Sequence, residues 1–239
     1  MTKINYIHTA ERHHPKDALE ILPYVFQLIN PKSLLDVGCA NGSWLNAAED
    51  LGVKDIFGVD GISVDASMKL LDDSKFLQHD LRTPLDLGRT FDMVMSLEVA
   101  EHLPETAANT LVATLVHHSE VVLFSAAIPG QGGQYHINEQ WPEYWHEKFK
   151  AYGYEAYDIL RERFWNNPKM FWWYKQNVMF FVKKGSGKLE EFSPTNTIHG
   201  LVHPELFRKK IFRPKYYDKK QLWVFSKMFL KEYLKALKK

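Results

Sequence analysis

The chain of 239 residues is poor in cysteine and has no long apolar run. Cys39 is its single cysteine, which excludes an intramolecular disulfide and favours a reducing, cytoplasmic compartment. A transmembrane helix needs about 18 or more consecutive apolar residues, and the sequence contains no such run. The opening MTKINYIHTAERHH also lacks the apolar stretch of a signal peptide. We therefore expect a cytoplasmic protein.

Acidic residues are scarce at the C-terminal end. From Arg208 onward there are twelve Lys and Arg but only two acids, Asp218 and Glu232. The other residues carry 18 bases and 27 acids, so the net charge of +1 conceals an acidic body and a basic tail. The acidic body argues against extensive nucleic-acid binding. The 45% hydrophobic composition is enough for one sizeable core.

Short apolar runs alternate with helical patterns. Residues 15–30 predict a helix that ends at Asn30–Pro31. Strands are expected at Ser33–Val37, Asp55–Val59, Lys75–Gln78, Asp92–Leu97, Glu120–Ser125, Glu155–Leu160 and Gln176–Val182, and helices at Trp44–Leu51, 105–117 and Pro142–Tyr152. Strands separated by helices indicate βαβ units and an α/β fold with a mostly parallel sheet.

The best candidate for a domain boundary is Lys183–Gly187 (KKGSG). We expect a domain over 1–185, with residues 1–30 as an N-terminal helical cap, and a basic extension over 186–239. Lys219–Lys239 predicts an amphipathic helix. Its apolar arc is Leu222, Phe225, Phe229, Tyr233 and Leu237, opposite Lys227, Lys231, Lys235 and Lys238. The helix could contact the body or a second subunit, an anionic membrane, or nucleic-acid phosphates.

The most informative stretch is LLDVGCANGSW, residues 34–44, in which an apolar strand runs through a glycine turn into a helix. Glycines let the backbone approach a ligand closely, and the helix N-terminus offers unpaired N–H groups. A dinucleotide fingerprint has three glycines, G-x-G-x-x-G, but here Asp36 replaces the first, before Gly38 and Gly42. A carboxylate there suits a cation better than a pyrophosphate, which argues against a nucleotide-cofactor oxidoreductase or sugar epimerase. The sulfonium and amino group of S-adenosylmethionine supply such cations.

Two further acids follow at the ends of expected strands. Asp60 ends the second strand, where a carboxylate can accept both hydroxyls of an adenosine ribose. Asp80 follows the third strand and could receive the adenine amino group. Three acids at successive strand ends, in register with a glycine turn, point to one adenosine-containing cofactor.

The segments LLDVGCANG, GVDG, HDL and FDMVMSLEVAEHL resemble motifs I to IV of the class I S-adenosylmethionine-dependent methyltransferases, over roughly residues 30–185. The resemblance implies a Rossmann-like, seven-stranded, mostly parallel sheet with flanking helices and one antiparallel strand. Ala40 departs from the pattern, because glycine is commoner there. The cofactor contacts that the resemblance implies are Asp36, Gly38, Cys39, Ala40, Gly42, Trp44, Asp60, Gly61, Asp80, Leu81, Ser96, Leu97 and Glu98.

The fourth strand runs directly into a possible catalytic cluster. If the chain turns helically there, Glu98, Glu101 and His102 share one face at the carboxyl edge of the sheet. Together with His136, from a polar loop after the fifth strand, they could hold a divalent metal such as Mg²⁺ or Mn²⁺. This pattern resembles the metal site of metal-dependent O-methyltransferases of small-RNA 3′ ends and of the ubiquinone pathway. By that likeness the ion would lower the pKa of an acceptor hydroxyl.

Metal-free roles are the alternatives at the same residues. Glu98 would then contact only the cofactor, Glu101 would cap or pair, and His102 or His136 would act as the general base. A purely orienting role of the cluster is the third alternative. The glycine-rich surroundings of His136 suit a mobile lid. The expected catalytic residues are therefore His102, His136 and Glu101, with or without an ion.

The acceptor is expected to be a sugar, nucleotide-sugar or glycan hydroxyl, because HINEQWPEYWHEKF and FWWYKQNVMFFV resemble methyltransferases of polysaccharide and natural-product pathways. The candidate substrate contacts are Gln134, Tyr135, Asn138 and Trp141, which offer hydrogen bonds and flat rings. Trp141 and Trp145 could instead pack a helix onto the sheet, and Trp172 and Trp173 are expected in the core or an interface. A metal-dependent RNA 2′-O-methyltransferase, a small-molecule N-methyltransferase and a catalytically silent cofactor-binding protein stay open, as does oligomerisation.

Overall fold

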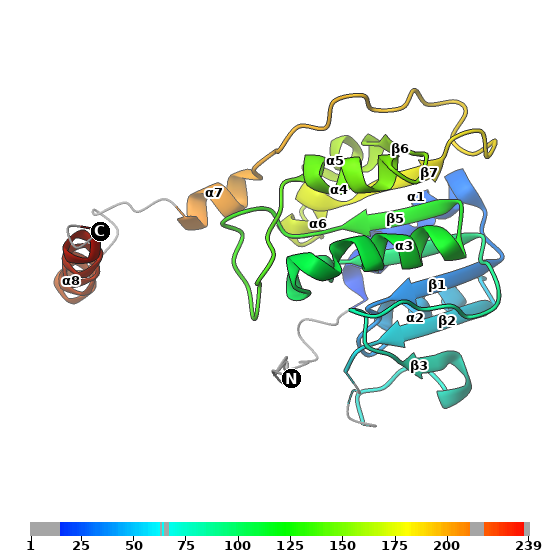
Figure 1. Cartoon of the computed structure of the whole chain (residues 1–239), viewed down its shortest axis with the longest axis horizontal. Coiled ribbons are helices and arrows are strands. Elements are labelled where there is room, and N and C mark those ends of the chain that lie inside the picture. Colours follow the sequence, from blue (N-terminus) through cyan, green and yellow to red (C-terminus); the bar gives the residue numbers. More distant parts are fainter. Residues whose placement is uncertain (1–14, 63, 65–66, 211–217, 237–239) are drawn as a thin grey trace. The chain divides into compact units, whose positions relative to one another are not determined.

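One seven-stranded sheet forms the centre of the first of the chain's two compact units, residues 1–203 (Figure 1). A computed structural model describes residues 15–62, 64, 67–210 and 218–236. The strand order is β3-β2-β1-β4-β5-β7-β6, with β7 antiparallel to both of its neighbours and the other pairs parallel. The strands are β1 Ser33–Val37, β2 Asp55–Asp60, β3 Phe76–Gln78, β4 Met93–Leu97, β5 Val121–Ser125, β6 Tyr154–Tyr157 and β7 Met179–Lys183. The predicted Rossmann-like fold with one antiparallel strand is confirmed.

Helices connect the strands. The first unit of the chain contains α1 Lys16–Ile29, α2 Ser43–Asp50, α3 Ala108–His118, α4 Pro142–Lys150, α5 Ile159–Phe164 and α6 Trp172–Asn177, with 3₁₀ turns η1 Asp73–Lys75, η2 Ala100–His102 and η3 Glu105–Ala107. Two predicted strand boundaries are wrong by three residues, whereas the others agree to within one residue. The strand expected over Glu155–Leu160 ends at Tyr157 because α5 begins at Ile159, and Gln176 belongs to α6 rather than to the last strand.

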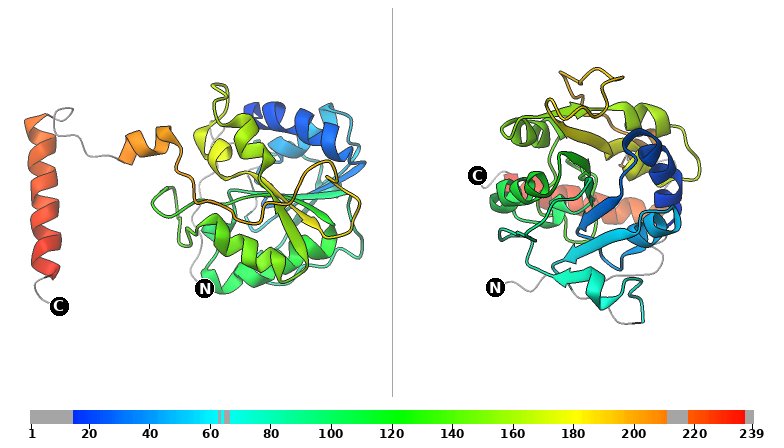
Figure 2. Two further views of the ribbon diagram at one scale, coloured as in Figure 1. Left: turned by 90° about the horizontal axis from the view of Figure 1, so that it is seen from above. Right: turned by 90° about the vertical axis from the view of Figure 1, so that its right-hand side faces the viewer.

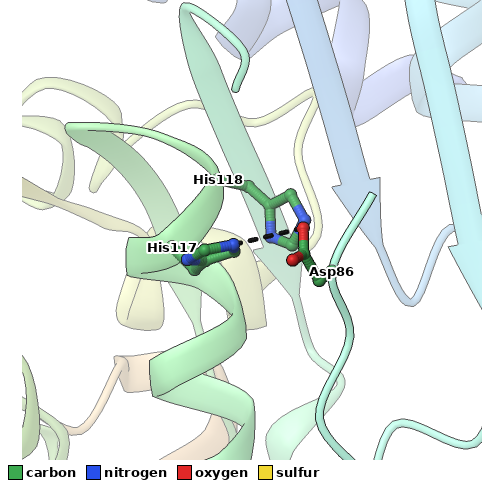
Figure 3. A group of neighbouring side chains, drawn as sticks. All are labelled: Asp86, His117 and His118. Carbon is green, nitrogen blue, oxygen red and sulfur yellow. Dashed lines mark ion pairs between the residues drawn. The ribbon is translucent and has the colours of Figure 1, made fainter. Parts of the chain in front are cut away.

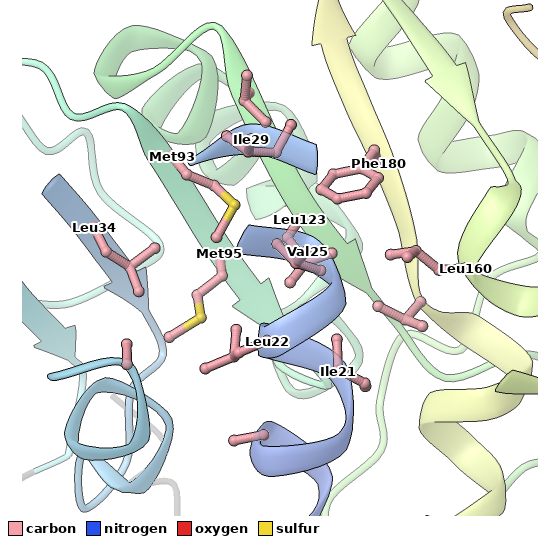
Figure 4. Close-up of a cluster of buried hydrophobic side chains, with 14 of the residues drawn as sticks. Ile21, Leu22, Val25, Ile29, Leu34, Met93, Met95, Leu123, Leu160 and Phe180 are labelled. Carbon is pink, nitrogen blue, oxygen red and sulfur yellow. The ribbon is translucent and has the colours of Figure 1, made fainter. Parts of the chain in front are cut away.

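Each face of the sheet is covered by its own helices, because alternate residues of a strand point to opposite faces. Leu34 packs in a cluster with α1, α2 and α5, whereas the adjacent Leu35 packs with α3 and α4. Figure 4 shows the first cluster, in which α1 lies across the sheet. The α1 residues that line it follow helical spacing: Ile21, Leu22, Val25 and Ile29. Each such buried side chain contributes roughly 1.5–3 kcal/mol to stability.

The chain divides into two compact units, residues 1–203 and 204–239. The expected boundary at Lys183–Gly187 falls inside the first unit, since the segment that follows it packs there. Thr195 donates its backbone N–H to the carbonyl of Ala156 at 2.7 Å, and Nη1 of Arg161 donates to the carbonyl of His199 at 3.0 Å. Residues 1–14 of the expected N-terminal cap lie outside the described residues.

The second unit contains α7 Pro204–Lys210 and α8 Lys219–Ala236. The predicted amphipathic helix is therefore present as α8, although Leu237 and Lys238 lie outside the described residues, as does the side chain of Lys235. Across the described ranges, no helix combines the length and apolarity needed to cross a membrane.

Candidate active site

A pocket of about 610 Å³ opens at the carboxyl ends of the parallel strands. In open α/β sheets, ligands bind where the strand order reverses, and here that point lies between β1 and β4, which pair in parallel. Figure 2 shows helices on both sides of this sheet. The expected residues that line the pocket are Asp36, Gly38, Cys39, Ala40, Trp44, Asp60, Gly61, Asp80, Leu81, Leu97, Glu98, Glu101, His102, Gln134 and His136. Gly42 and Ser96 do not line it; Ser96 is fully buried within β4.

The turn after β1 requires its two glycines. Gly38 has φ +93°, and a Cβ there would lie 2.3 Å from a methyl group of Val99. Gly42 has φ +83°, and its Cβ would lie 2.4 Å from Cγ of Leu71. Ala40 also adopts a left-handed φ of 49°, which costs a residue with a side chain some strain. Ala40, the one departure from the family's glycine pattern, therefore has a backbone conformation that glycine would adopt without strain.

Asp36 and Asp60 create a negative site beside this turn. Asp60 accepts the backbone N–H groups of Ala40 at 2.8 Å and Ile62 at 2.9 Å, which fixes its carboxylate at the end of β2. Asp36 is buried, and the pKa of its carboxyl is raised well above the usual range, first by burial and then by the charge of Asp60. A cationic ligand in the pocket would offset the cost of ionising Asp36.

Asp80 is paired with a residue that sequence reasoning missed. Nε of Arg82 lies 2.8 Å from Oδ1 of Asp80, and Nη2 lies 2.7 Å from Oδ2. This ion pair lowers the pKa of Asp80, chiefly through the hydrogen bond from Arg82. Both residues line the pocket, so the carboxylate expected to receive the adenine amino group is held ionised there.

Glu98 points to buried amides. Its Oε1 accepts from Nδ2 of Asn177 at 3.0 Å and its Oε2 from Nε2 of Gln131 at 2.8 Å. Burial raises the pKa of Glu98 to about 7, although these amides and Ser125 act in the opposite direction. The residue also has a left-handed φ of 55°, and it is not a member of the group formed by Glu101, His102 and His136.

Glu101, His102 and His136 come together as expected. One potential ligand atom from each lies within 4.8 Å of those of the other two, and the two imidazole rings meet edge to face at 4.9 Å. Glu101 is 1% exposed, and within the described structure its Oε2 is buried without a hydrogen-bond partner. Burial and then the charge of Glu98 raise the pKa of Glu101 well above its usual range. A buried carboxylate in this state can bind a proton, a cation or a hydrogen-bond donor of a ligand.

Glu139 organises the glycine-rich loop that carries His136. Its Oε2 accepts the N–H of Gly130 at 2.8 Å, and its Oε1 lies 2.5 Å from the N–H of Gly132 and 2.8 Å from Nδ1 of His136. Gly133 allows close approach, since a Cβ there would lie 2.1 Å from Nε2 of His136. With Nδ1 engaged by Glu139, Nε2 is the nitrogen of His136 that can act on a ligand.

The four expected substrate residues differ in whether they line the pocket. Gln134 lines the pocket, whereas Tyr135, Asn138 and Trp141 do not. Asn138 is buried and its Oδ1 accepts from Gln140, and Trp141 packs against Gly200, where a Cβ would lie 2.6 Å from its ring. These contacts hold the loop rather than line the pocket.

Aromatic residues of α6 line the pocket instead. Trp172, Trp173 and Tyr174 form part of its wall. Trp172 is also buried, as expected of a core residue, whereas Trp173 is only partly buried. Tyr174 packs against Trp44 with ring centroids 5.2 Å apart. Trp145, in contrast, is buried against the sheet, as its alternative reading predicted.

A second cluster, Asp86, His117 and His118, lies outside the pocket (Figure 3). His118 is buried at the end of α3, where its Nδ1 contacts the carbonyl of Thr114 at 2.7 Å. Its Nε2 accepts the N–H of Leu87 at 3.1 Å. Because both ring nitrogens are engaged by backbone groups, His118 ties α3 to the preceding loop.

Comparison with known proteins agrees with this geometry. A family model described as a methyltransferase domain matches residues 8–158, more than half of the chain. Among solved structures, DesVI of Streptomyces venezuelae is 18% identical, with a TM-score of 0.54 over 72% of this chain and 93% of that one. CalS10, an amino pentose methyltransferase of Micromonospora echinaspora involved in calicheamicin biosynthesis, is 17% identical, with a TM-score of 0.54 over 77% of this chain and 100% of that one.

A third structure is the magnesium protoporphyrin IX methyltransferase of Synechocystis with bound S-adenosylhomocysteine. It is 14% identical, with a TM-score of 0.50 over 75% of this chain and 89% of that one. No curated protein matches the chain in sequence. The family match, the sheet order and the acid-lined glycine turn together show that the chain belongs to the methyltransferase domain family, as a class I S-adenosylmethionine-dependent methyltransferase.

Proposed function

We propose that this methyltransferase transfers the methyl group to a hydroxyl oxygen of a sugar, nucleotide sugar or glycan. The observation that carries the proposal is the contact between Glu139 and His136, which directs Nε2 of His136 to act beside Glu101 and His102. An alcohol is a poor nucleophile until its proton is removed, whereas an amine needs little such help. A built proton acceptor at the pocket therefore favours an oxygen acceptor.

The reaction is an in-line displacement. The acceptor oxygen forms a bond to the methyl carbon while the carbon–sulfur bond breaks, and the sulfonium becomes the neutral thioether of S-adenosylhomocysteine. The hydroxyl proton passes to the His102–His136 pair. Asp36 and Asp60 bind the donor and Glu139 orients His136, so the enzyme's main contribution is to hold donor and acceptor close and aligned.

The pocket wall supports a sugar as the acceptor. Trp173, which is only partly buried, offers a flat apolar face, and Gln134 offers an amide for hydroxyl groups. RNA is a weaker candidate because the acidic body lacks the wide basic surface that phosphate binding needs. An amino sugar is the stronger alternative, since CalS10 is described as an amino pentose methyltransferase.

A second candidate role for the cluster is to hold a divalent cation such as Mg²⁺ or Mn²⁺. Glu101, His102 and His136 would be its ligands, and Oε2 of Glu101, which has no hydrogen-bond partner among the described residues, fits that role. The contact of His136 with Glu139 fits too, because histidine ligands of metals commonly donate their other N–H to a carboxylate. Glu98, occupied by two amides, would not be a ligand. A bound cation would lower the pKa of the acceptor hydroxyl.

Mass spectrometry of nucleotide sugars and short glycans, incubated with enzyme and S-adenosylmethionine, tests the acceptor class. We expect a gain of one methyl group, and NMR of the product should place it on oxygen. His136→Ala should remove most of the turnover, whereas His117→Ala, at an exposed histidine outside the pocket, should retain it. A methyl group found on nitrogen, or full turnover by His136→Ala, would contradict the proposal.

Chelation separates the two roles of the cluster. Full turnover in EDTA would eliminate the cation and leave the histidine base. Loss of turnover that Mg²⁺ or Mn²⁺ restores would assign the cation. Calorimetry with Mn²⁺ alone gives an independent reading, because His136→Ala should abolish any metal-binding heat and His117→Ala should not.

A further inference from the structure

Helix α8 exposes large apolar side chains over much of its length. Trp223, Leu230 and Tyr233 are exposed by 58%, 57% and 62%, and Phe229 and Leu234 are exposed as well. The helix begins in a defined way: Asp218 and Gln221 exchange hydrogen bonds between backbone N–H and side chain, as in a capping box. The exposed apolar side chains therefore belong to a helix whose N-terminus is capped.

Lysines follow one edge of the apolar face. On a helical projection with about 3.6 residues per turn, the apolar arc covers roughly half of the circumference. Lys220, Lys227 and Lys231 fall beside the edge that carries Trp223. Nζ of Lys227 lies 3.5 Å above the ring of Trp223, so a cation and an indole meet where the two faces join. Tryptophan and lysine at such a boundary are typical of helices at a lipid surface.

From these features we infer that α8 lies in the plane of an anionic lipid membrane, with its apolar face among the acyl chains and its lysines at the headgroups. The arc is wider than the narrow seam of a two-stranded coiled coil, which argues against self-pairing. A helix bound to nucleic acid would use the lysines and leave the apolar face unexplained. The basic charge of the tail matches anionic headgroups, each nearby lysine strengthening the attraction.

Sedimentation of the full chain with lipid vesicles tests the inference. We expect binding to phosphatidylcholine vesicles that contain about a third phosphatidylserine, weakening with added salt, and little binding to phosphatidylcholine alone. Lys227→Ala combined with Lys231→Ala should weaken binding roughly thirtyfold. Lys184→Ala with Lys188→Ala removes equal charge from the first unit and should have little effect.

The apolar face has its own matched pair of variants. Leu230→Glu places a carboxylate in the apolar face, whereas Gln221→Glu adds the same charge on the polar side and preserves the capping pair. We expect Leu230→Glu to bind at least tenfold more weakly than Gln221→Glu. Circular dichroism checks the helix content of each variant. Thermal stabilisation by S-adenosylhomocysteine checks that the first unit is folded, because residues of that unit line the pocket.

Three results would overturn the inference. The first is no sedimentation of the parent with anionic vesicles. The second is equal vesicle binding by Leu230→Glu and Gln221→Glu, which would leave only an electrostatic contact. The third is lysine-dependent RNA binding, or a dimer that Leu230→Glu dissociates in light scattering, with no vesicle binding in either case.

Discussion

Nδ1 of His136 lies 2.8 Å from Oε1 of Glu139, three residues along the chain. The same carboxylate also accepts the N–H groups of Gly130 and Gly132. One side chain therefore both shapes the glycine-rich loop and sets which nitrogen of His136 can act on a ligand. In the proposed mechanism, Glu139 therefore positions His136 without itself reaching the reacting atoms.

Replacing Glu139 by Gln should lower kcat about ten- to a hundredfold. The amide nitrogen cannot accept from an N–H, so one of the three contacts becomes a clash between donors. KM and the affinity for S-adenosylhomocysteine should change little. Glu143→Gln, an exposed position on α4, is the matched control. Equal kcat values for the two variants would show that Glu139 does not position the histidine.

Glu98 should make the ligand-free protein less stable at higher pH. Its pKa is about 7 in the folded state against an ordinary 4.5, so between these values the folded protein holds a proton that the unfolded chain has lost. The stabilisation is complete below about pH 4.5 and is lost as the pH rises through about 7.

Urea unfolding at about pH 5 and about pH 8 measures this effect. The parent should lose about 3 kcal/mol more between the two conditions than Glu98→Gln does. The variant retains part of the decline because the raised pKa of Glu101 acts in the same direction. Parallel declines in both proteins would mean that Glu98 titrates normally.

Two neighbouring substitutions in the glycine turn should change the stability of the fold in opposite directions. Gly38→Ala should destabilise the fold by at least about 2 kcal/mol and weaken binding of S-adenosylhomocysteine, because φ is +93° and the new Cβ meets Val99. Ala40→Gly relaxes a left-handed residue and should be neutral or stabilising by up to about 1 kcal/mol. Adding Val99→Ala to Gly38→Ala should recover only part of the stability, since the strained φ remains. Full recovery would assign the whole cost to the clash.

The cluster of Figure 3 should be structural. His118→Ala removes the partners of the Leu87 N–H and the Thr114 carbonyl, and should cost about 2–3 kcal/mol of stability. His117→Ala, at an exposed neighbour, should cost little. Neither should change the affinity for S-adenosylhomocysteine, and thermal unfolding with and without that ligand measures both effects. A stability of the parent that rises with added Zn²⁺ and needs His118 would instead indicate a metal site.

The strands and the glycine turn could be predicted because their signals are local. A short apolar run marks Ser33–Val37, with Asp36 near its end, and Gly38 and Gly42 follow in the turn directly after it. The position of Glu98 could not be predicted from a helical spacing, since its left-handed φ and its amide partners Gln131 and Asn177 depend on distant segments.

The aromatic wall was missed for a related reason. Trp172 is a core residue, as expected, but it also lines the pocket together with the partly buried Trp173, and only the tertiary position of α6 places them there. Conversely, Trp141 is a flat ring in a polar loop, yet it packs against Gly200. Residue type identified candidates for ligand contact, but only their position relative to the carboxyl edge of the sheet decides which of them line the pocket.

Calorimetric titration of S-adenosylhomocysteine is the most direct measurement for the cofactor site. The parent should bind it and should give no heat with NAD. Asp60→Ala should bind at least tenfold more weakly, whereas Asp73→Ala, at an exposed acid of η1, should match the parent. Circular dichroism should show that both variants are folded. Parental affinity in Asp60→Ala, or clear binding of NAD to the parent, would contradict the assignment of the acidic strand ends to the methyl donor.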